Sequence, residues 1–367
     1  MTEINKDGVE NRTVLMPSEA TKARNVPKEK IYELVFRLFG MTVLSSRKVD
    51  SWDDQNFYIT CKDTDNTIQI SPHGYTLKIV NAVDSKVPAF IDAQHAMAKR
   101  ISESGLTCPV PVKNLKSSYK SLEELSTENG NVELRLVHMV TFIPGEVLAD
   151  IPLTPSIVRH LGGYMTKLRG ALQGFYHAGY EDHQTIYNIE CTPKLMEFME
   201  SVTGCEKKEL YTEVIRAYES EIVPKYDSLT KGVIHGDITA KNIIMNKNSP
   251  DCNVAAVIDF GDSVNSVHVF DLAVAIAAFI YESKLDVLEI LENVLSPYTK
   301  VFPLTAEESS VLKVAIAARL TIIGVMVEYM YSLKKEAYFL EEGKNAYKRL
   351  KEFWEIPVDE INKTYMQ

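Results

Sequence analysis

The sequence predicts an α+β protein of two lobes, in which the first lobe is an antiparallel sheet with a helix and the second is mostly helical. Three observations lead to this prediction. The 367 residues suffice for two domains of roughly 100–200 residues each. Strand-like runs dominate up to about residue 142, and helical spacing of apolar residues dominates after it. We expect a disordered tail over residues 1–26, an N-terminal lobe over 27–141 and a C-terminal lobe over 142–367.

The N-terminal lobe begins with a helix signal. Pro27 precedes apolar residues that share one helical face, and Gly40 ends the pattern. Apolar runs separated by turn-forming linkers then predict strands, and one further helix ends at Gly105. The expected strands are 42–49, 56–61, 75–80, 111–116 and 132–142, the expected helix is 89–104, and the polar insert 117–131 is expected to be a loop.

Beyond residue 142 the apolar residues recur at helical spacing, as in Ile157, Leu161, Met165 and Leu168. The expected helices are 155–171, 193–201, 206–222, 267–281, 285–295, 306–333 and 336–353.

Composition limits the partners. The net charge is −10, from 40 basic and 50 acidic residues, which argues against nucleic acid because phosphate backbones require clustered Lys and Arg. The five cysteines show no CxxC spacing and are expected to be free thiols in a reducing compartment. The first residues lack the apolar core of a signal peptide, and no run of about 18 apolar residues occurs. We expect a cytoplasmic protein that binds neither nucleic acid nor a membrane.

One stretch, residues 233–262, carries most of the chemical information. A His-Gly-Asp sequence ends at Asp237, Asn242 follows five residues later, and an Asp-Phe-Gly sequence begins at Asp259. Apolar runs precede both motifs, as in buried strands that deliver side chains to a site. This order is typical of phosphoryl transfer. We expect Asp237 to be the base that orients the attacking hydroxyl, and Asn242 and Asp259 to hold Mg²⁺ through oxygen atoms.

Neighbouring residues are expected to support this stretch. We interpret His235 and Asp271 as structural residues that hold the loop by hydrogen bonds, since a buried Asp needs polar partners. Gly236 is expected to permit a positive φ or a close backbone approach. Asp262 either contacts a substrate ammonium or stabilises the loop.

A further candidate lies in the N-terminal lobe. Lys78 stands between Leu77 and Ile79 in the strand 75–80, so its side chain points to the opposite face. A lysine in a strand is usually solvated, but phosphoryl transfer requires a lysine on the nucleotide phosphates. Together with the downstream motifs, Lys78 is predicted to be that residue.

These motifs resemble the aminoglycoside phosphotransferase-like family of small-molecule kinases, over residues 27–360. The resemblance implies a two-lobed protein-kinase-like fold, with a nucleotide-binding N-terminal lobe and a catalytic, substrate-binding C-terminal lobe. It also implies a purine nucleotide, GTP or ATP, bound with Mg²⁺ between the lobes.

The same resemblance implies roles for four more residues of the N-terminal lobe. Asn56 belongs to a glycine-free loop that would cover the nucleotide phosphates. Asp92 would be the helix acid that steadies Lys78, although the family usually has the longer Glu. The backbone near Val140 and Thr141 would meet the purine.

Within the family, the order of elements and the local runs 53–57, 142–145 and 259–262 are most similar to the hydroxylysine kinases. This similarity implies GTP-dependent phosphorylation of the side-chain hydroxyl of 5-hydroxylysine. Related acceptors, such as choline, ethanolamine, homoserine or an aminoglycoside, are the alternative.

Acceptor recognition is expected on the C-terminal helices. A basic amino acid would need carboxylates for its ammonium groups and Arg for its carboxylate. Asp262, Glu282, Arg319 and Glu328 are the candidates. Glu282, Arg319 and Glu328 can also be ordinary charged residues at the edge of a helix, with the charged group in solvent.

Two functions of other classes are alternatives. A non-catalytic nucleotide-binding protein would have lost the Lys, Asp or Asn of the site, and none is lost. A protein kinase is disfavoured by the missing Gly-rich loop and by the helix that begins soon after Asp262, which leaves no activation loop.

Overall fold

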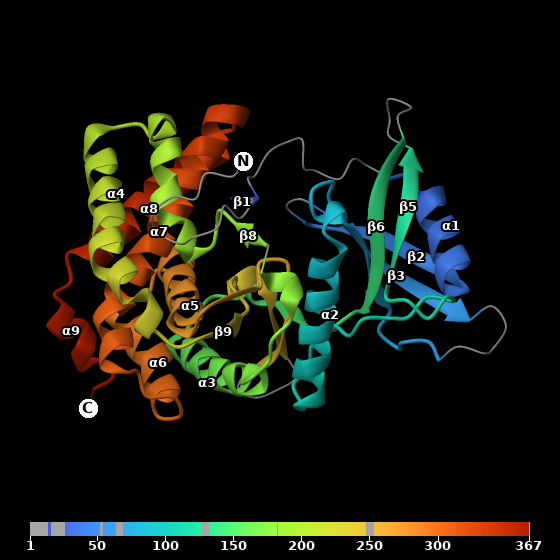
Figure 1. Ribbon diagram of the computed structural model, residues 1–367, viewed down its shortest axis with the longest axis horizontal. Coiled ribbons are helices and arrows are strands. Elements are labelled where there is room, and N and C mark those ends of the chain that lie inside the picture. The colour runs from blue at the N-terminus through green and yellow to red at the C-terminus, as the bar shows by residue number, and fades with distance from the viewer. Residues whose placement is uncertain are drawn as a thin grey trace. The chain divides into compact units, whose positions relative to one another are not determined.

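The computed structural model describes residues 14–15, 26–51, 54–63, 69–126, 132–181, 183–246 and 253–366 (Figure 1). The chain divides into two compact units. The N-terminal unit comprises Leu15–Pro144 and His177–His183, and the C-terminal unit comprises Met1–Val14, Gly145–Tyr176 and Gln184–Gln367. The expected disordered tail falls outside the described residues except for the short strand β1 (Val14–Leu15) and Val26.

The N-terminal unit is built on a five-stranded sheet in the order β2-β3-β4-β6-β5, and each neighbouring pair is antiparallel. The strands are β2 (Met41–Val49), β3 (Gln55–Asp63), β4 (Tyr75–Ile79), β5 (Lys120–Ser126) and β6 (Val132–Thr141). Helix α1 (Lys28–Phe39) follows Pro27 and ends at Gly40, where φ is 68°. The predicted antiparallel sheet with a helix is confirmed.

The core of this unit lies between α1 and one face of the sheet. It consists of Ile31, Leu34, Val35 and Leu38 from α1 and of Phe57, Ile59, Leu77, Val137 and Met139 from the strands. Because side chains alternate along a strand, Asn56, Lys78 and His138 point to the other face. Helix α2 (Pro88–Glu103) packs on that face, where His95 contacts His138.

Two strand predictions in this unit are wrong. The insert expected as a loop contains β5, which pairs with β6 along its whole length. Its buried Glu123 and Leu125 alternate with exposed residues, as suits an edge strand, and the polar composition hides it. The segment 111–116 makes an isolated bridge between Pro111 and Val140. Beyond it, the N–H groups of Asn114 and Leu115 donate to the carbonyl oxygens of Ser118 and Leu38, so the segment leaves β6.

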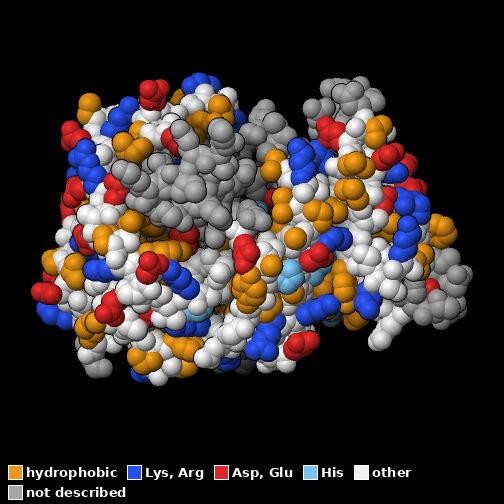
Figure 2. Space-filling view, in the orientation of Figure 1, with side chains coloured by type: hydrophobic (Ala, Val, Ile, Leu, Met, Phe, Trp, Pro, Cys, Tyr) orange, Lys and Arg blue, Asp and Glu red, His pale blue; other side chains and the backbone are white. Residues whose placement is uncertain are grey.

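The C-terminal unit is mostly helical, as predicted. Its α-helices are α3 (Pro155–Leu172), α4 (Cys205–Ala217), α5 (His268–Glu282), α6 (Val287–Thr299), α7 (Ala306–Lys334), α8 (Ala337–Trp354) and α9 (Val358–Lys363). The predicted helix 193–201 is part of a 3-10 helix, Ile189–Ser201, that contains Pro193. A π-helical turn, Tyr218–Ile222, continues α4. The visible face in Figure 2 carries basic and acidic side chains interspersed.

Short strands complete the unit. They are β7 (Glu146–Val147), β8 (Gln184–Thr185), β9 (Lys231–Ile234), β10 (Ile243–Asn246), β11 (Asn253–Val257) and β12 (Val264–Val267). One small sheet has the order β11-β10-β7 and another pairs β12 with β9.

Helix α7 packs against α4, α5, α8 and the 3-10 helix 189–201. By length and composition it could cross a membrane, but 78% of its most apolar window is buried inside the structure. A helix that is apolar around most of its circumference is typical of a domain core. Its charged residues Arg319 and Glu328 are only 4% and 2% exposed, so each needs a polar partner inside the unit.

Candidate active site

Two antiparallel strand pairs, of which β10–β11 is a hairpin, bring together the two halves of the stretch 233–262. β9 pairs with β12, so Ile234 lies opposite Val264, and β10 pairs with β11, so Ile243 lies opposite Val257. The polar residues after β9 therefore lie beside those between β11 and β12. The apolar runs of the sequence are the strands that deliver these polar residues.

The residues predicted to be structural hold this segment. Asp271, on α5, accepts hydrogen bonds from the backbone N–H groups of His235 (3.3 Å) and Gly236 (2.9 Å). Burial lowers the pKa of His235, and its Nε2 lies 3.2 Å from the carbonyl oxygen of Ile258. Gly236 has a φ of 79°, and a Cβ there would lie 2.2 Å from the carbonyl oxygen of Asp262. The structural interpretation of His235, Gly236 and Asp271 is confirmed.

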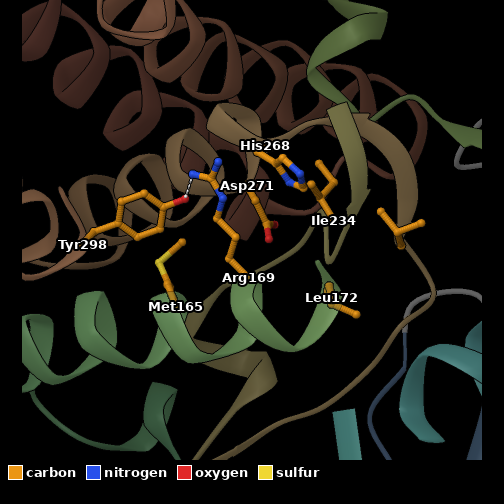
Figure 3. Close-up of a pocket in the computed structure, with 8 residues that line it drawn as sticks. Met165, Arg169, Leu172, Ile234, His268, Asp271 and Tyr298 are labelled. Carbon is orange, nitrogen blue, oxygen red and sulfur yellow. Dashed lines mark hydrogen bonds between the residues drawn. The ribbon is translucent and has the colours of Figure 1, made fainter. Parts of the chain in front are cut away.

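A cavity of about 10 Å³ lies beside this segment. Figure 3 shows Arg169, His268, Asp271 and Tyr298 around it, and Arg169 donates to the Tyr298 hydroxyl at 2.8 Å. Such a volume holds one water at most. It is therefore too small for a nucleotide or an acceptor.

The three residues predicted to carry the chemistry lie together on the catalytic segment. The Asp237 side chain is 22% exposed, and its Oδ2 accepts a hydrogen bond of 2.6 Å from Nδ2 of Asn242. The same Nδ2 also donates to the Asp237 carbonyl oxygen at 3.0 Å. Because the amide nitrogen is used in this way, the amide oxygen of Asn242 is the atom that can bind a cation. Asp259 is exposed and has a φ of 64°, which is uncommon outside glycine and is found at functional sites.

These residues fit Mg²⁺ better than a metal that needs a closed cage. Among the described residues, no three His, Cys, Asp or Glu side chains converge as a metal site. Mg²⁺ usually binds one or two protein oxygens and fills its other positions with waters and substrate phosphates. The amide oxygen of Asn242 and the exposed carboxylate of Asp259 match that requirement.

Negative charge is concentrated around Asp237. Burial raises the pKa of Asp237, and Arg319 opposes this shift. Burial, followed by repulsion from Asp237, raises the pKa of Asp262 to about 7, and a hydrogen bond of 2.9 Å from Thr185 lowers it. Carboxylates so placed favour a positively charged partner.

Two further acceptor candidates lie beside the same segment. Glu282 is exposed at the end of α5, and its Oε2 accepts a hydrogen bond of 3.1 Å from the backbone N–H of Ala240. Arg319 does not have a solvated head. Its Nη2 lies 2.8 Å from Asp237 Oδ1, and its Nη1 donates to the carbonyl oxygen of Tyr187 at 2.5 Å.

Glu328 does not lie with them. It forms a buried ion pair with Lys207 of α4 and accepts a hydrogen bond of 3.1 Å from Thr203. Nine residues of α-helix are about two and a half turns, so Glu328 and Arg319 leave α7 on opposite sides. We therefore remove Glu328 from the acceptor candidates.

In the N-terminal unit, the strand register places Asn56 and His138 directly opposite Lys78. Asn56 is 7% exposed, and its Oδ1 is buried without a hydrogen-bond partner. A buried acceptor of this kind is uncommon, and it lies beside the predicted phosphate-binding lysine. The loop residues Trp52 and Asp53 lie outside the described residues.

Asp92 is placed differently from the expectation. It forms an ion pair with Lys120, which also donates to the carbonyl oxygen of Pro88 at 2.8 Å. His95 of α2 reaches the face of the sheet that carries Lys78, and its Nε2 lies 2.9 Å from Nδ1 of His138. The correction arises because Lys120 belongs to β5, which was expected to be a loop.

The backbone near Val140 and Thr141 is partly used by the sheet. Val140 pairs with Thr76 in the ladder between β4 and β6. The Thr141 N–H donates to the carbonyl oxygen of Val110 at 2.9 Å. This N–H is therefore not available to donate a hydrogen bond to a purine. The Thr141 carbonyl oxygen remains a candidate acceptor for one.

Sequence reasoning missed several residues of the site. These are Thr185, which contacts Asp262, and Tyr187, which contacts Arg319. The pairing of Arg319 with Asp237 was missed as well. Each contact joins distant segments, and no spacing in the sequence indicates it. His138 could have been found, because pairing the strand 75–80 with the strand 132–142 places it opposite Lys78.

Comparison with known proteins shows the family and the fold of the chain. Residues 47–294 match the model of the phosphotransferase enzyme family. The chain is 27% identical over 355 residues to the hydroxylysine kinase of Xenopus laevis, covering 93% of each. It is 26% identical over 232 residues to the homoserine kinase of Methylobacillus glycogenes, covering 61% of this chain and 62% of that protein.

Two solved structures share the fold. An amicoumacin kinase superposes with a TM-score of 0.66 at 14% identity, over 90% of this chain and 94% of the other. A microcompartment-associated aminopropanol kinase superposes with a TM-score of 0.65 at 16% identity, over 89% and 95%. These likenesses confirm the kinase-like two-part fold.

Proposed function

Because the chain belongs to the phosphotransferase enzyme family, we propose that it transfers the γ-phosphoryl group of GTP or ATP to the hydroxyl of a small, amino-containing acceptor. The chain is a small-molecule kinase, a phosphotransferase that acts on a hydroxyl group. The acceptor we propose is 5-hydroxylysine, since relatives named hydroxylysine kinases align over most of the chain. We also propose a cytoplasmic location.

The observation that supports this reaction best is the Asp237 carboxylate, held by Asn242 on one side and 22% exposed. In phosphoryl transfer the base mainly orients the hydroxyl, and stabilisation of charge provides most of the catalysis. An accessible, fixed carboxylate is suited to that task. Bound at Asn242 and Asp259, Mg²⁺ would supply charge neutralisation on the phosphate oxygens.

The preference for an amine follows from charge. Asp262 and Glu282 provide carboxylates beside the base, and Glu282 is open to solvent. Burial, followed by repulsion from Asp237, raises the pKa of Asp262, and an acceptor ammonium bound there would relieve this repulsion. A neutral alcohol would leave this repulsion in place.

For the nucleotide, we propose that Lys78 binds the phosphates and that the unpartnered amide oxygen of Asn56 accepts a hydrogen bond in the same region. The Thr141 carbonyl oxygen would accept from the purine. Asp92 acts, in this proposal, only through its ion pair with Lys120.

A turnover screen tests the function. GTP and ATP are each combined with 5-hydroxylysine, homoserine, choline, ethanolamine and an aminoglycoside, and phosphorylated product is measured. We expect turnover with 5-hydroxylysine and none with lysine, which has the same charges but no side-chain hydroxyl. Preference for another acceptor would replace 5-hydroxylysine. Nucleotide binding without turnover of any acceptor would favour a non-catalytic protein.

The partial match to homoserine kinase makes homoserine the second candidate. Homoserine has one ammonium group and 5-hydroxylysine has two. If Asp262 and Glu282 serve a side-chain ammonium, replacing both by amides should impair 5-hydroxylysine turnover more than homoserine turnover.

A further inference from the structure

Arg319 contacts the base itself. It lies in the middle of α7, is 4% exposed, and directs Nη2 to Asp237 Oδ1 at 2.8 Å. Its Nη1 is held by the carbonyl oxygen of Tyr187 at 2.5 Å, and its Cζ lies 5.8 Å from the centre of the Tyr187 ring. The guanidinium is thus held by Tyr187 as well as by the carboxylate of Asp237.

Both oxygens of Asp237 are therefore held. Oδ1 accepts from Arg319 and Oδ2 accepts from Asn242. Two fixed donors determine the plane of a carboxylate, and an ionised carboxylate has about four lone-pair sites. The remaining sites are available to a substrate hydroxyl at the exposed part of the side chain.

Turning Arg319 towards an acceptor would be costly. The movement would break the hydrogen bonds to Asp237 and to Tyr187, and it would leave a mostly buried carboxylate without its cation. The planar, rigid fork of an arginine suits a fixed support better than a mobile receptor.

We propose that Arg319 is a positioning residue that fixes the Asp237 carboxylate in the orientation needed to receive the acceptor hydroxyl. This inference rests on the kinase reaction proposed above. It assigns Arg319 to the base, whereas the sequence suggested that Arg319 binds the carboxylate of the acceptor. The two roles predict different kinetics.

The first test is the split between kcat and KM in Arg319→Gln. A displacement of the base by about 1 Å can cost about 100-fold in rate, so we expect a kcat loss of that order with little change in either KM. Arg319→Lys keeps the charge but not the fork, and should recover part of the lost kcat. A large rise in acceptor KM at unchanged kcat would overturn the proposal and make Arg319 an acceptor receptor.

The second test asks whether Arg319 acts through Asp237. Residues that act as one unit show strongly non-additive losses. We therefore expect Asp237→Asn with Arg319→Gln to be no slower than Asp237→Asn alone. An additional loss in the double variant equal to that of Arg319→Gln alone would contradict the proposal.

A matched control separates positioning from stability. Arg349 of α8 pairs with Glu352 and donates to the carbonyl oxygens of Ile280 (2.7 Å) and Leu285 (2.9 Å), in the same unit. We expect Arg349→Gln to lower Tm and to leave kcat unchanged. Should Arg319→Gln fail to fold, the kinetic test is made with Arg319→Lys. A wild-type kcat in that folded variant would contradict the proposal that the planar guanidinium positions Asp237.

The failure of the proposed function would be visible separately, as absent turnover in the unmodified enzyme. The pair can then be tested without turnover, through Tm. Arg319→Gln and Asp237→Asn should each lower Tm, and the double variant should lower it by less than their sum, because each single variant leaves one partner unpaired. Additive shifts would show that the two side chains do not act together.

Discussion

Arg319 and Glu328 belong to the same helix, carry opposite charges and are almost equally buried, at 4% and 2% exposed. Their partners differ. Arg319 meets Asp237 and the Tyr187 carbonyl oxygen, whereas Glu328 meets Lys207 and Thr203. The middle of α7 therefore contacts the candidate active site, and the part nearer its C-terminal end contacts α4.

The difference shows that burial alone does not identify a functional charge. Both residues must be paired, because an unpaired charge in a core is costly. The partner decides which process the pair serves. Loss of a functional pair should change turnover, and loss of a structural pair should change stability.

The largest expected effect concerns the partner of Arg319. Asp237→Ala should lower kcat by about 10²- to 10⁴-fold, as for other general bases, while nucleotide binding persists. Steady-state turnover and calorimetric nucleotide titration measure the two quantities. Near-normal turnover in this variant would show that Asp237 is not the base. The Arg319–Asp237 pair would then not differ in function from the Glu328–Lys207 pair.

Glu328→Gln should lower stability and leave turnover unchanged, the opposite of Asp237→Ala. Removing one charge of a buried pair costs about 3 kcal/mol of unfolding free energy, and kcat should stay unchanged. Denaturant unfolding measures the loss. Glu341→Gln is the control, because Glu341 pairs with Lys344 at the surface and should change stability by less than about 1 kcal/mol. Lost turnover in a folded Glu328→Gln enzyme would contradict the view that the Glu328–Lys207 pair serves stability alone.

Asp262→Asn should give a smaller, kinetic effect. It removes one carboxylate near the base, so we expect about a tenfold rise in acceptor KM, the size of one modest charge contact. In the wild type, the pKa of Asp262 is raised from 3.8 to about 7. An acceptor ammonium binds the ionised form, so acceptor KM should fall as pH rises through about 7 in the wild type and change less in Asp262→Asn.

The same shift determines a stability trend without acceptor. Because the folded pKa of Asp262 lies above its unfolded value, the folded state binds more protons between them. Its stabilising contribution is complete below the unfolded pKa and is lost as pH rises through about 7. The difference in Tm between Asp262→Asn and wild type should therefore move in favour of the variant as pH rises. No pH dependence of that difference would argue against a raised pKa.

The smallest expected effect is at the Glu328 end of α7. Cys205 is exposed at the start of α4, whereas Cys191 is buried and its pKa is raised to about 12 by burial. A thiol reagent should therefore modify Cys205 before Cys191 and leave kcat unchanged. Mass spectrometry of the labelled peptides checks the order. Early labelling of Cys191 would show that this end of the unit opens more readily than its packing indicates.

Local features of this protein were readable from the sequence. Asp237, Asn242 and Asp259 follow short apolar runs within one stretch of the chain, and their order in it is typical of phosphoryl transfer. A positive φ or a close backbone approach was expected at Gly236 because glycine permits both, and the structure shows a φ of 79° and a close approach to Asp262. Asp92 and Glu328 were not readable, since their partners Lys120 and Lys207 come from elements far along the chain.

By itself, the sequence determined most of the helices and most strands of the N-terminal sheet, because hydrophobic periodicity and turn signals are local properties. The kinase-like fold and the candidate chemical motif followed from the resemblance carried by residues 233–262. Tertiary structure alone decided that Arg319 supports Asp237, that Glu328 holds α4, and that a polar insert is the edge strand β5. Those outcomes depend on which side of α7 each charge occupies and on which strand pairs with β6. Such contacts join distant segments, and the residue types alone do not specify them.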